Sequence, residues 1–255
     1  MNIILFDDIP KFISITDPRG RHLKKVLRVR RGDTFRAGLV NGPLGEIRVL
    51  TVNGGGSEAE EAGSGSVGTK EGYEVEWRET GPAVEPWPLS LIVGFVRPIS
   101  AKRILREAAS LGVGRLIFTV TDTGERSYRE ANLWKGREWR EYLVNGLQTA
   151  GATVLPDLLL TGGVEEAVRW AEKNDGSARF VLDNISPEVS LAGLNLKARE
   201  VVLAVGSERG WSSRERRIFG EAGFESVGLG GRVLRTETAC SVGAALALAG
   251  MGLLL

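Results

Sequence analysis

The chain has 255 residues, of which 42% are hydrophobic, and its 33 basic and 32 acidic side chains leave a formal net charge of +1. This length and composition predict a soluble globular protein that can bury a substantial core, in one large domain or two smaller ones. A single cysteine, Cys240, excludes a disulfide framework, and a single histidine, His22, leaves almost no material for a zinc cluster or a Ser-His-Asp site, so metal-free chemistry is expected.

Residues 1–80 predict a small β-barrel. Short strand-like stretches are separated by Gly and Asp turns and show little helical periodicity. Residues 53–70 are rich in Gly, Ser and Glu and too polar to fold alone, which predicts a flexible loop between two strands. Acidic residues and a proline interrupt the apolar opening, so no signal peptide and a cytoplasmic location are expected. The predicted strands cover residues 3–6, 34–39, 46–52 and 73–77.

A basic cluster lies within this first part. Between residues 19 and 36 the only acid is Asp33, and such a cluster attracts phosphate and makes binding salt-dependent. On charge alone, the solvated face of a helix or hairpin explains the cluster equally well. The cluster consists of Arg19, Arg21, Lys24, Lys25, Arg28, Arg30, Arg31 and Arg36.

The stretch that follows changes in character. Residues 78–88 contain three prolines and predict an interdomain linker. From residue 89 onward strands and helices alternate, which is typical of a parallel sheet covered on both faces, with ligands at the carboxyl ends of its strands. Ser100 is expected to cap the first helix and Gly112 to end it. The predicted strands cover residues 89–96, 116–120, 180–183, 201–205 and 226–229.

The C-terminal stretch, residues 239–255, carries no charge. It is shorter than the about 20 residues that a membrane span needs, and it contains Gly243, Gly250 and Gly252. A buried helix is therefore favoured, and no membrane association is expected. A helix that is apolar all round must be covered on every side, and packing against its own sheet and a partner subunit would do that.

The strongest functional signal lies in residues 201–239. A β-branched strand ends at Gly206, and Ser212 and Glu215 have the spacing of a capping box. A second short strand ends in another glycine turn, after which Arg235 opens the last helix. Two strand ends therefore deliver backbone and polar groups to one place, although either turn alone is more often an ordinary strand-to-helix connection.

Together these residues resemble the SPOUT superfamily of methyltransferases, and more narrowly its bacterial family that methylates N3 of a uridine in 16S ribosomal RNA. GSERGWSSRE (206–215) is similar to that family's GPEGGF turn, and LGGRVLRTETA (229–239) is similar to its LG, ILR and TETA signature. Three further segments resemble family segments, so the resemblance spans nearly the whole chain. These are HLKKVLRVRRGD (22–33), KRILREAASLGV (102–113) and ERS (125–127).

The resemblance implies an α/β fold with two domains. Residues 89–255 are expected to form a SPOUT methyltransferase domain with a parallel sheet and a trefoil knot, which periodicity cannot reveal. Residues 1–80 are expected to form a PUA-like β-barrel that binds RNA, with the flexible insert at 53–70. The resemblance further implies S-adenosylmethionine as cofactor, 16S ribosomal RNA or the small ribosomal subunit as partner, and a homodimer.

The implied reaction suggests catalytic roles as a hypothesis, and the resemblance assigns the RNA and cofactor contacts. Arg235 is expected to stabilise negative charge on the uracil carbonyls, while Glu237 or Glu208 accepts the N3 proton or orients the base; a structural ion pair between Arg235 and Glu237 is the alternative. The expected RNA contacts are His22, Arg28 and Arg126. The expected cofactor contacts are Leu182, Val205, Gly206, Glu208, Gly210, Leu229, Gly230, Val233, Leu234 and Thr236.

The chain departs from the family pattern at several positions. Ser207 and Arg209 replace a Pro and a Gly of the turn, which predicts a less rigid loop with an extra cation beside the cofactor, and Leu147 and Ala152 replace a Glu and an Arg. Two alternatives therefore stay open: a catalytically weak relative that binds ribosomal RNA as an assembly factor, and a SPOUT enzyme that acts on another RNA site. A dinucleotide oxidoreductase is disfavoured, because no strand is followed by the full phosphate-binding glycine fingerprint.

Overall fold

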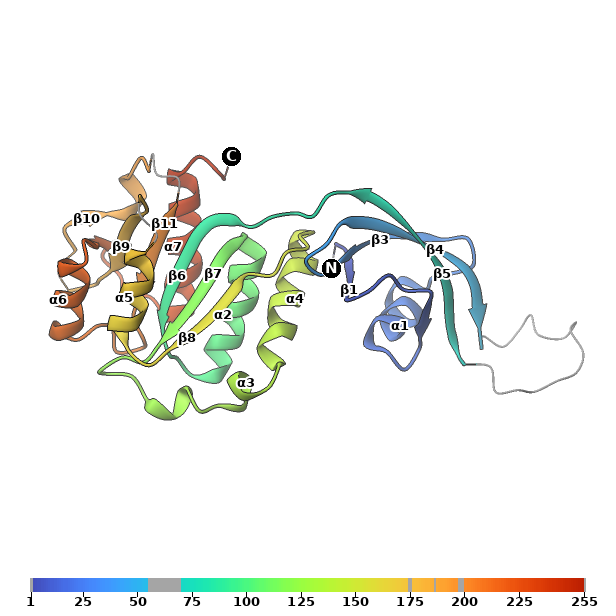
Figure 1. Ribbon diagram of the computed structural model, residues 1–255, viewed down its shortest axis with the longest axis horizontal. Coiled ribbons are helices and arrows are strands. Elements are labelled where there is room, and N and C mark those ends of the chain that lie inside the picture. Colours follow the sequence, from blue (N-terminus) through green and yellow to red (C-terminus); the bar gives the residue numbers. More distant parts are fainter. Residues whose placement is uncertain (1, 55–69, 174–175, 186, 197–199, 255) are drawn as a thin grey trace, which may run out of the picture. The chain divides into compact units, whose positions relative to one another are not determined.

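The computed structural model describes residues 2–54, 70–173, 176–185, 187–196 and 200–254 (Figure 1). Contacts between Cα atoms divide the chain into two units, Met1–Val84 and Glu85–Leu255. The first unit contains a five-stranded sheet and the second a seven-stranded sheet. The predicted flexible loop at 53–70 lies, apart from its two ends, outside the described residues.

The five strands of the first unit contribute to one hydrophobic core. β1 is parallel to β3, and the other pairs in the order β1-β3-β4-β5-β2 are antiparallel. Alternate residues point inward, as the two-residue period of a strand requires, and the buried set includes Ile4, Ile13, Ala37, Ile47 and Val75. The strands are β1 (Ile4–Phe6), β2 (Phe12–Ser14), β3 (Thr34–Leu39), β4 (Leu44–Asn53) and β5 (Gly72–Gly81).

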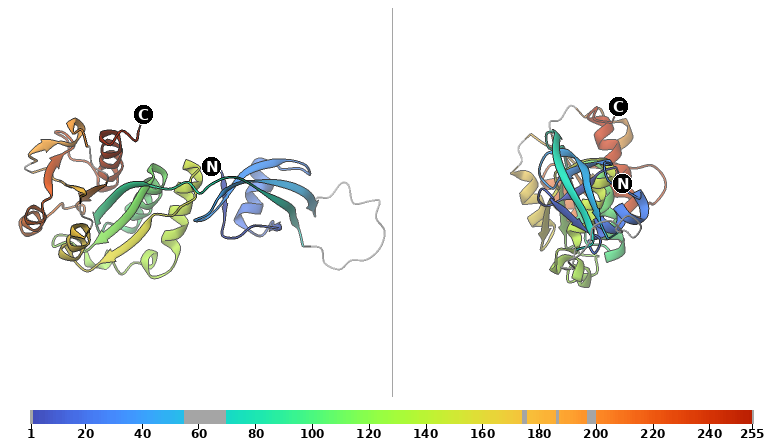
Figure 2. Two further views of the ribbon diagram at one scale, coloured as in Figure 1. Left: turned by 45° about the horizontal axis from the view of Figure 1, so that its top comes forward. Right: turned by 90° about the vertical axis from the view of Figure 1, so that its right-hand side faces the viewer.

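A short helical segment packs beside this sheet (Figure 2). The helix α1 (Pro18–His22) begins at Asp17, whose carboxylate accepts the Arg19 N–H at 2.8 Å, and it continues as a π-helix, η1 (Leu23–Leu27). Leu23 is fully buried in the core of the unit. The segment ends at Arg28, which has a left-handed backbone with φ of +51°.

The seven strands of the second unit are all parallel, in the order β10-β12-β9-β11-β6-β7-β8. The predicted bounds of β11, a fully buried run, are confirmed. β8 and β10 were not predicted, because β8 is largely exposed or half-buried and β10 has only two residues. The strands are β6 (Trp87–Gly94), β7 (Val113–Thr119), β8 (Asp157–Thr161), β9 (Ala178–Leu182), β10 (Val189–Ser190), β11 (Val201–Val205) and β12 (Glu225–Gly228).

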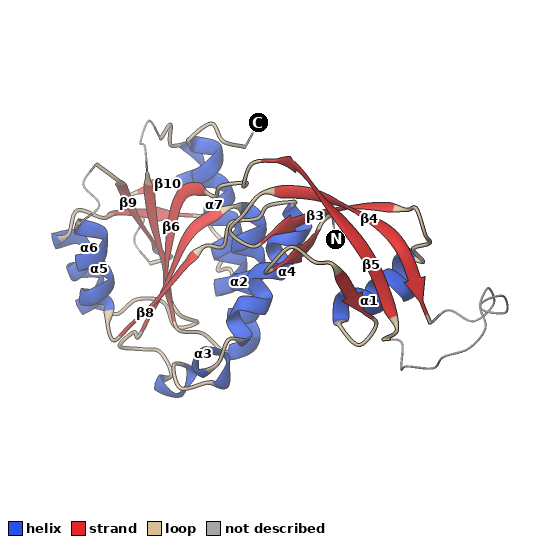
Figure 3. Cartoon of the chain, turned by 45° about the vertical axis from the view of Figure 1, so that its right-hand side comes forward, coloured by secondary structure: helices blue, strands red, loops and turns tan. Residues whose placement is uncertain are grey.

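Helices cover both faces of this sheet, as the alternating pattern predicted (Figures 1 and 3). On one face α2 (Pro98–Leu111) and α7 (Thr236–Gly250) lie side by side, and α4 (Glu138–Ala150) packs on α2. On the other face α5 (Val164–Glu172) and α6 (Ser213–Glu221) enclose a core that includes Ile92, Val202 and Phe219. The shorter elements are η2 (Arg126–Tyr128), α3 (Asn132–Lys135) and η3 (Leu191–Gly193).

Two local predictions need correction. Ser100 is not the cap of α2: the helix begins at Pro98, because the fixed φ of proline suits a first helical position, and Ser100 lies within the first turn. The predicted end at Gly112 is confirmed by its left-handed φ of +80°. The predicted linker at 78–88 is also too long, because β5 continues to Gly81 and β6 begins at Trp87.

Candidate functional site

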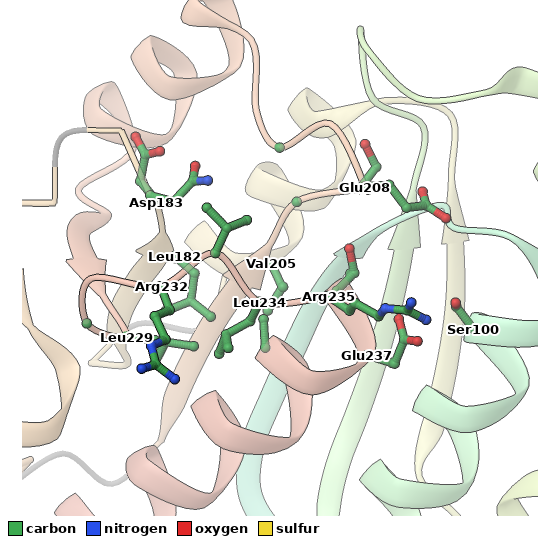
Figure 4. Close-up of a pocket in the computed structure, with 18 of the residues that line it drawn as sticks. Ser100, Leu182, Asp183, Val205, Glu208, Leu229, Arg232, Leu234, Arg235 and Glu237 are labelled. Atoms are coloured by element: carbon green, nitrogen blue, oxygen red, sulfur yellow. The ribbon is translucent and has the colours of Figure 1, made fainter.

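A pocket of about 480 Å³ lies at the carboxyl ends of β9, β11 and β12, three neighbouring strands of the seven-stranded sheet (Figure 4). Its walls come from the residues that follow these strands and from the beginning of α7. Open parallel sheets bind ligands outside the carboxyl ends of their strands, and small-molecule pockets typically measure about 300–1,000 Å³. The pocket is therefore the candidate functional site.

The turn after β11 is formed by close backbone contacts. A Cβ on Gly206 would lie 2.8 Å from the Cα of Gly210, and Gly210 itself has φ of +68°. The Gly210 N–H donates to the Ser207 carbonyl at 2.9 Å. Thr121 Oγ1 donates to Ser207 Oγ at 3.3 Å, and Thr123 Oγ1 donates to the Gly210 carbonyl at 3.0 Å. Tertiary hydrogen bonds therefore hold the turn at the position where the family's proline is replaced.

The helix after this turn begins at the predicted residue. Ser212 Oγ accepts the Glu215 N–H at 3.1 Å, and the Glu215 carboxylate accepts the Ser212 N–H at 2.7 Å. The capping box predicted from the spacing of these residues is thus confirmed. It fixes the exit of the turn that forms one wall of the pocket.

The loop after β9 carries a buried carboxylate. Only 5% of the Asp183 side chain is exposed, and Arg216 of α6 donates to both of its oxygens, at 2.7 and 3.2 Å. Burial alone would raise the pKa of Asp183, but the bonds from Arg216 and from the Ile185 N–H outweigh it and lower the pKa below its ordinary value. The loop is thereby tied to α6.

The loop after β12 leads into α7. Gly230 has a left-handed φ of +102°, and the Val233 side chain is 79% exposed. Arg235 precedes the helix with an extended backbone, and Thr236 is its first residue. The positive end of the α7 dipole therefore faces the pocket, where it favours negative charge.

The pocket has an apolar middle, with a polar end on the side of α2 and further polar residues, Asp183 and Arg232, on the opposite side. Figure 4 shows Leu182, Val205 and Leu234 gathered in its middle, with Arg235 and Glu237 on the side of α2. Aliphatic surface suits a flat heterocycle, whereas a cation and a carboxylate suit a reacting polar group. The arrangement can therefore bind one ligand along its length and hold its polar end for chemistry.

The two carboxylates of the polar end are held by different groups. Glu237 pairs with Arg103 of α2, with 3.4 Å between Oε1 and the guanidinium, and Glu208 Oε1 accepts the Arg97 N–H at 3.0 Å. Among the described residues Arg235 has no ion pair, so the alternative of an Arg235–Glu237 pair is not seen there. The Arg235 guanidinium is thus available to a ligand.

The structure brings together all the residues that the resemblance assigned to the cofactor and to catalysis. They come from three loops and the first turn of α7, and their roles remain predictions. The set comprises Leu182, Val205, Gly206, Glu208, Gly210, Leu229, Gly230, Val233, Leu234, Arg235, Thr236 and Glu237.

The residues predicted to contact RNA lie elsewhere. Arg126 is an exposed residue of η2 and does not line the pocket. In the first unit Arg28 is exposed and His22 half-buried. Arg19, a member of the basic cluster, is held by Asp17 at 2.7 Å and lies over the Phe6 ring. The other cations of the cluster are exposed.

Sequence reasoning missed several lining residues. Arg97 and Ser100 follow β6, the strand that pairs with β11, and the rule that sites lie at strand ends would have found them. Most of the others lie within or beside the segments already singled out at 206–215 and 229–239 or at the end of the predicted strand 180–183, but no role was assigned to them. They are Asp183, Asn184, Ser207, Arg232 and Ala239.

Two absences hold for the residues that the structure describes. No group of three or more His, Cys, Asp or Glu side chains is placed to hold a metal ion there. No helix in these ranges has the length and apolar character needed to cross a membrane.

The chain is similar to known proteins along most of its length. A family profile described as an RNA methyltransferase domain matches residues 84–248. Ribosomal RNA small subunit methyltransferase E of Treponema pallidum (strain Nichols) is 34% identical over 98% of this chain and 91% of that protein. Ribosomal RNA small subunit methyltransferase E 1 of Borreliella burgdorferi is 27% identical over 94% of each chain.

Solved structures share the fold. A ribosomal RNA small subunit methyltransferase E from Neisseria gonorrhoeae, bound to S-adenosyl methionine, has a TM-score of 0.71 at 21% identity, covering 98% of this chain and 97% of that one. A putative methyltransferase from Legionella pneumophila, in complex with the same cofactor, has a TM-score of 0.75 at 19% identity and covers 97% of both chains.

Proposed function

Because this chain belongs to the ribosomal RNA small subunit methyltransferase E family and contains its RNA methyltransferase domain, we propose that it methylates N3 of a uridine in 16S ribosomal RNA. S-adenosylmethionine is the proposed methyl donor, as two structures of the same fold contain it. One observation carries the proposal: the pocket at the strand ends places two carboxylates and Arg235, which forms no ion pair with the described residues, at one end of an apolar cradle.

The pocket suits this cofactor. Leu182, Val205 and Leu234 provide aliphatic surface for the adenine, and Gly206 lets the backbone approach without a side chain. The volume of about 480 Å³ also suits a nucleoside that carries an amino-acid side arm. When bound, S-adenosylmethionine supplies a methyl group activated by a positively charged sulfur.

Arg235 and the beginning of α7 would stabilise the acceptor. Removing the N3 proton of uracil leaves negative charge on its carbonyl oxygens, and a guanidinium beside them lowers the energy of that state. The positive end of the α7 dipole acts in the same direction. The helix end is fixed by the fold before substrate binds, and the backbone of Arg235 is fixed with it at the start of α7.

Glu237 and Glu208 are the candidates for accepting the proton or orienting the base. Each accepts a hydrogen bond through Oε1, from Arg103 and from the Arg97 N–H respectively, which leaves Oε2 for the uridine. The target nucleotide must leave any base pair before N3 is accessible. Glu237→Gln and Glu208→Gln distinguish the two roles. Only the replacement of the residue that accepts the proton should change the pH dependence of kcat.

The first unit is proposed to be a PUA-like barrel that binds RNA. One core collects side chains from all five strands, as a sheet curled around itself requires. The exposed cations beside η1, including Arg28, offer contacts to phosphate, with His22 next to them. Arg126 of η2 is the proposed RNA contact of the second unit.

The second unit is proposed to contain a trefoil knot. The residues after β10 pass over α7: the Leu196 N–H donates to the Gly250 carbonyl at 2.9 Å, and a Cβ on Gly250 would lie 2.8 Å from the Leu194 carbonyl oxygen. The same helix packs on β6 and β11. A final helix that contacts both its own sheet and an earlier loop is an arrangement that threading produces.

A homodimer is proposed because α7 remains partly uncovered. Gly243, Ala244 and Ala247 are buried, whereas Val242 and Ala249 are exposed on a helix without charges after Glu237. A second copy of the chain would cover these residues. The proposed location is the cytoplasm, where small ribosomal subunits are found.

Two measurements test the proposed function. Mass spectrometry of 16S ribosomal RNA from cells lacking this protein should show the loss of one N3-methyluridine, restored by the wild-type gene. Calorimetric titration should show binding of S-adenosylmethionine to the purified protein. An unchanged modification pattern would contradict the proposal; if cofactor binding were also absent, the chain would be a binding factor rather than an enzyme.

A further inference from the structure

A second, smaller pocket adjoins the polar end of the first. Its volume is about 140 Å³, and it shares Arg97, Ser207 and Glu208 with the main pocket. Pockets for whole small-molecule ligands typically exceed about 300 Å³, so this one suits a single group of a larger ligand. It is lined by Arg97, Thr123, Gly124, Glu125, Tyr128, Ser207, Glu208 and Arg209.

Arg209 belongs to this second pocket and not to the first. It is exposed on the turn after β11, and it is absent from the walls of the main pocket. Across the described ranges no hydrogen bond or ion pair engages its guanidinium. The cation that replaces the family's glycine therefore leaves the cofactor pocket open and faces the neighbouring space.

Arg97 places a second guanidinium at the same pocket. Its side chain lies beside the Tyr128 hydroxyl, and its backbone N–H donates to Glu208 Oε1 at 3.0 Å. The Glu208 bond ties the backbone of Arg97 to the turn after β11. A backbone that is already fixed lowers the entropy cost of placing the guanidinium against a ligand.

The two acids of the pocket already bind backbone donors. Glu125 accepts the Ser127 N–H at 3.4 Å, and Glu208 accepts the Arg97 N–H. Within the described residues, no hydrogen bond or ion pair joins either guanidinium group to a carboxylate. An anion with several oxygens complements such a pair of forked donors.

Resting on the function proposed above, we propose that this second pocket binds a phosphodiester group of the RNA strand next to the target uridine, with Arg97 and Arg209 as its contacts. A nucleotide that leaves the stack needs its backbone held close to the reaction site. The pocket lies beside the polar end of the cofactor pocket, where that uridine would react. In this arrangement Arg209 contacts the RNA and does not contact the cofactor.

The test compares Arg209→Ala and Arg97→Ala with a matched control, Arg217→Ala. Arg217 is exposed on α6, and within the described ranges its one ion pair is with Glu221 at 4.0 Å, so its loss removes the same charge away from both pockets. Binding of unmethylated small ribosomal subunits is measured without cofactor, between about 50 and 200 mM salt. Binding of S-adenosylmethionine is titrated separately.

Arg209→Ala should weaken subunit binding about tenfold and reduce the slope of log affinity against log salt by about one, while cofactor affinity stays within about twofold. Arg97→Ala should weaken subunit binding to a similar degree, and Arg217→Ala should match the wild type. In turnover, the KM for subunits should rise in Arg209→Ala with little change in kcat.

A wild-type salt slope and affinity in Arg209→Ala would overturn the proposal, and so would a loss of cofactor binding in that variant. Because subunit binding is measured without methyl transfer, this result is independent of whether the wild-type protein methylates N3. Failure of methylation in the wild type would contradict the proposed function, whereas equal salt slopes would contradict only the role of the second pocket.

Discussion

Glu215, in the first turn of α6, accepts the backbone N–H of Asp122, which follows β7 and lies 93 positions earlier in the chain, at 2.8 Å. Its other carboxylate oxygen accepts the Ser212 N–H, and the residue has 0% exposure. A buried carboxylate is stable only when such donors satisfy it. The pair therefore ties the loop after β7 to the turn that forms one wall of the pocket.

Replacing Glu215 by alanine should leave two backbone donors without their acceptor. Buried N–H groups without a hydrogen-bond acceptor destabilise the folded state, so we expect the free energy of unfolding to fall by about 3 kcal/mol. Urea unfolding of the whole protein measures the change. Glu221→Ala, on the exposed end of the same helix, should change it by less than about 0.5 kcal/mol. Equal effects of the two substitutions would show that the Glu215 bonds contribute little.

Gly206→Ala should weaken cofactor binding. The added Cβ would lie 2.8 Å from the Cα of Gly210, so the turn after β11 must open, and we expect the Kd for S-adenosylmethionine to rise at least about tenfold. Gly220→Ala is the control: its Cβ meets no atom within 4 Å, and alanine should stabilise α6 by up to about 1 kcal/mol. A Gly206→Ala protein with wild-type cofactor affinity would exclude close backbone approach at this turn.

Asp183→Asn should destabilise the protein in a pH-dependent way. The folded pKa of Asp183 lies below the ordinary value of 3.8, so its ion pair with Arg216 stabilises the fold fully above pH 3.8 and loses this effect as the pH falls toward the folded pKa. At pH 7 we expect a loss of about 2 kcal/mol. The difference between variant and wild type, measured by urea unfolding, should narrow near pH 3. If the difference in unfolding free energy between variant and wild type were the same at every pH, the destabilisation would come from packing and not from the ion pair.

Arg235→Ala should separate catalysis from cofactor binding. Removing a preorganised cation that stabilises developing charge typically lowers kcat by about 100-fold or more, and the cofactor contacts of the neighbouring leucines should remain. Methylation of small ribosomal subunits and calorimetric titration of S-adenosylmethionine measure the two properties. A near wild-type rate would reject the proposed role of Arg235, and Arg217→Ala again provides the control for charge.

The sequence alone determined the local features of this protein. The alternation of strands and helices from residue 89 predicted a parallel sheet covered on both faces. This was possible because the length and apolar character of each sequence run indicate whether that run forms a buried strand or a helix. The capping box at Ser212 and the end of α2 at Gly112 were also predictable, since each depends on hydrogen bonds or backbone angles within a few residues.

Only the tertiary structure decided which distant groups meet. The strand order β10-β12-β9-β11-β6-β7-β8 places Arg97, after β6, beside the turn after β11, where both Arg97 and Arg209 line the second pocket. The contact between Glu215 and Asp122 arises in the same way. Parallel strands do not reveal their neighbours by periodicity, because the order depends on how each crossover helix packs, and that packing is a property of the whole folded chain.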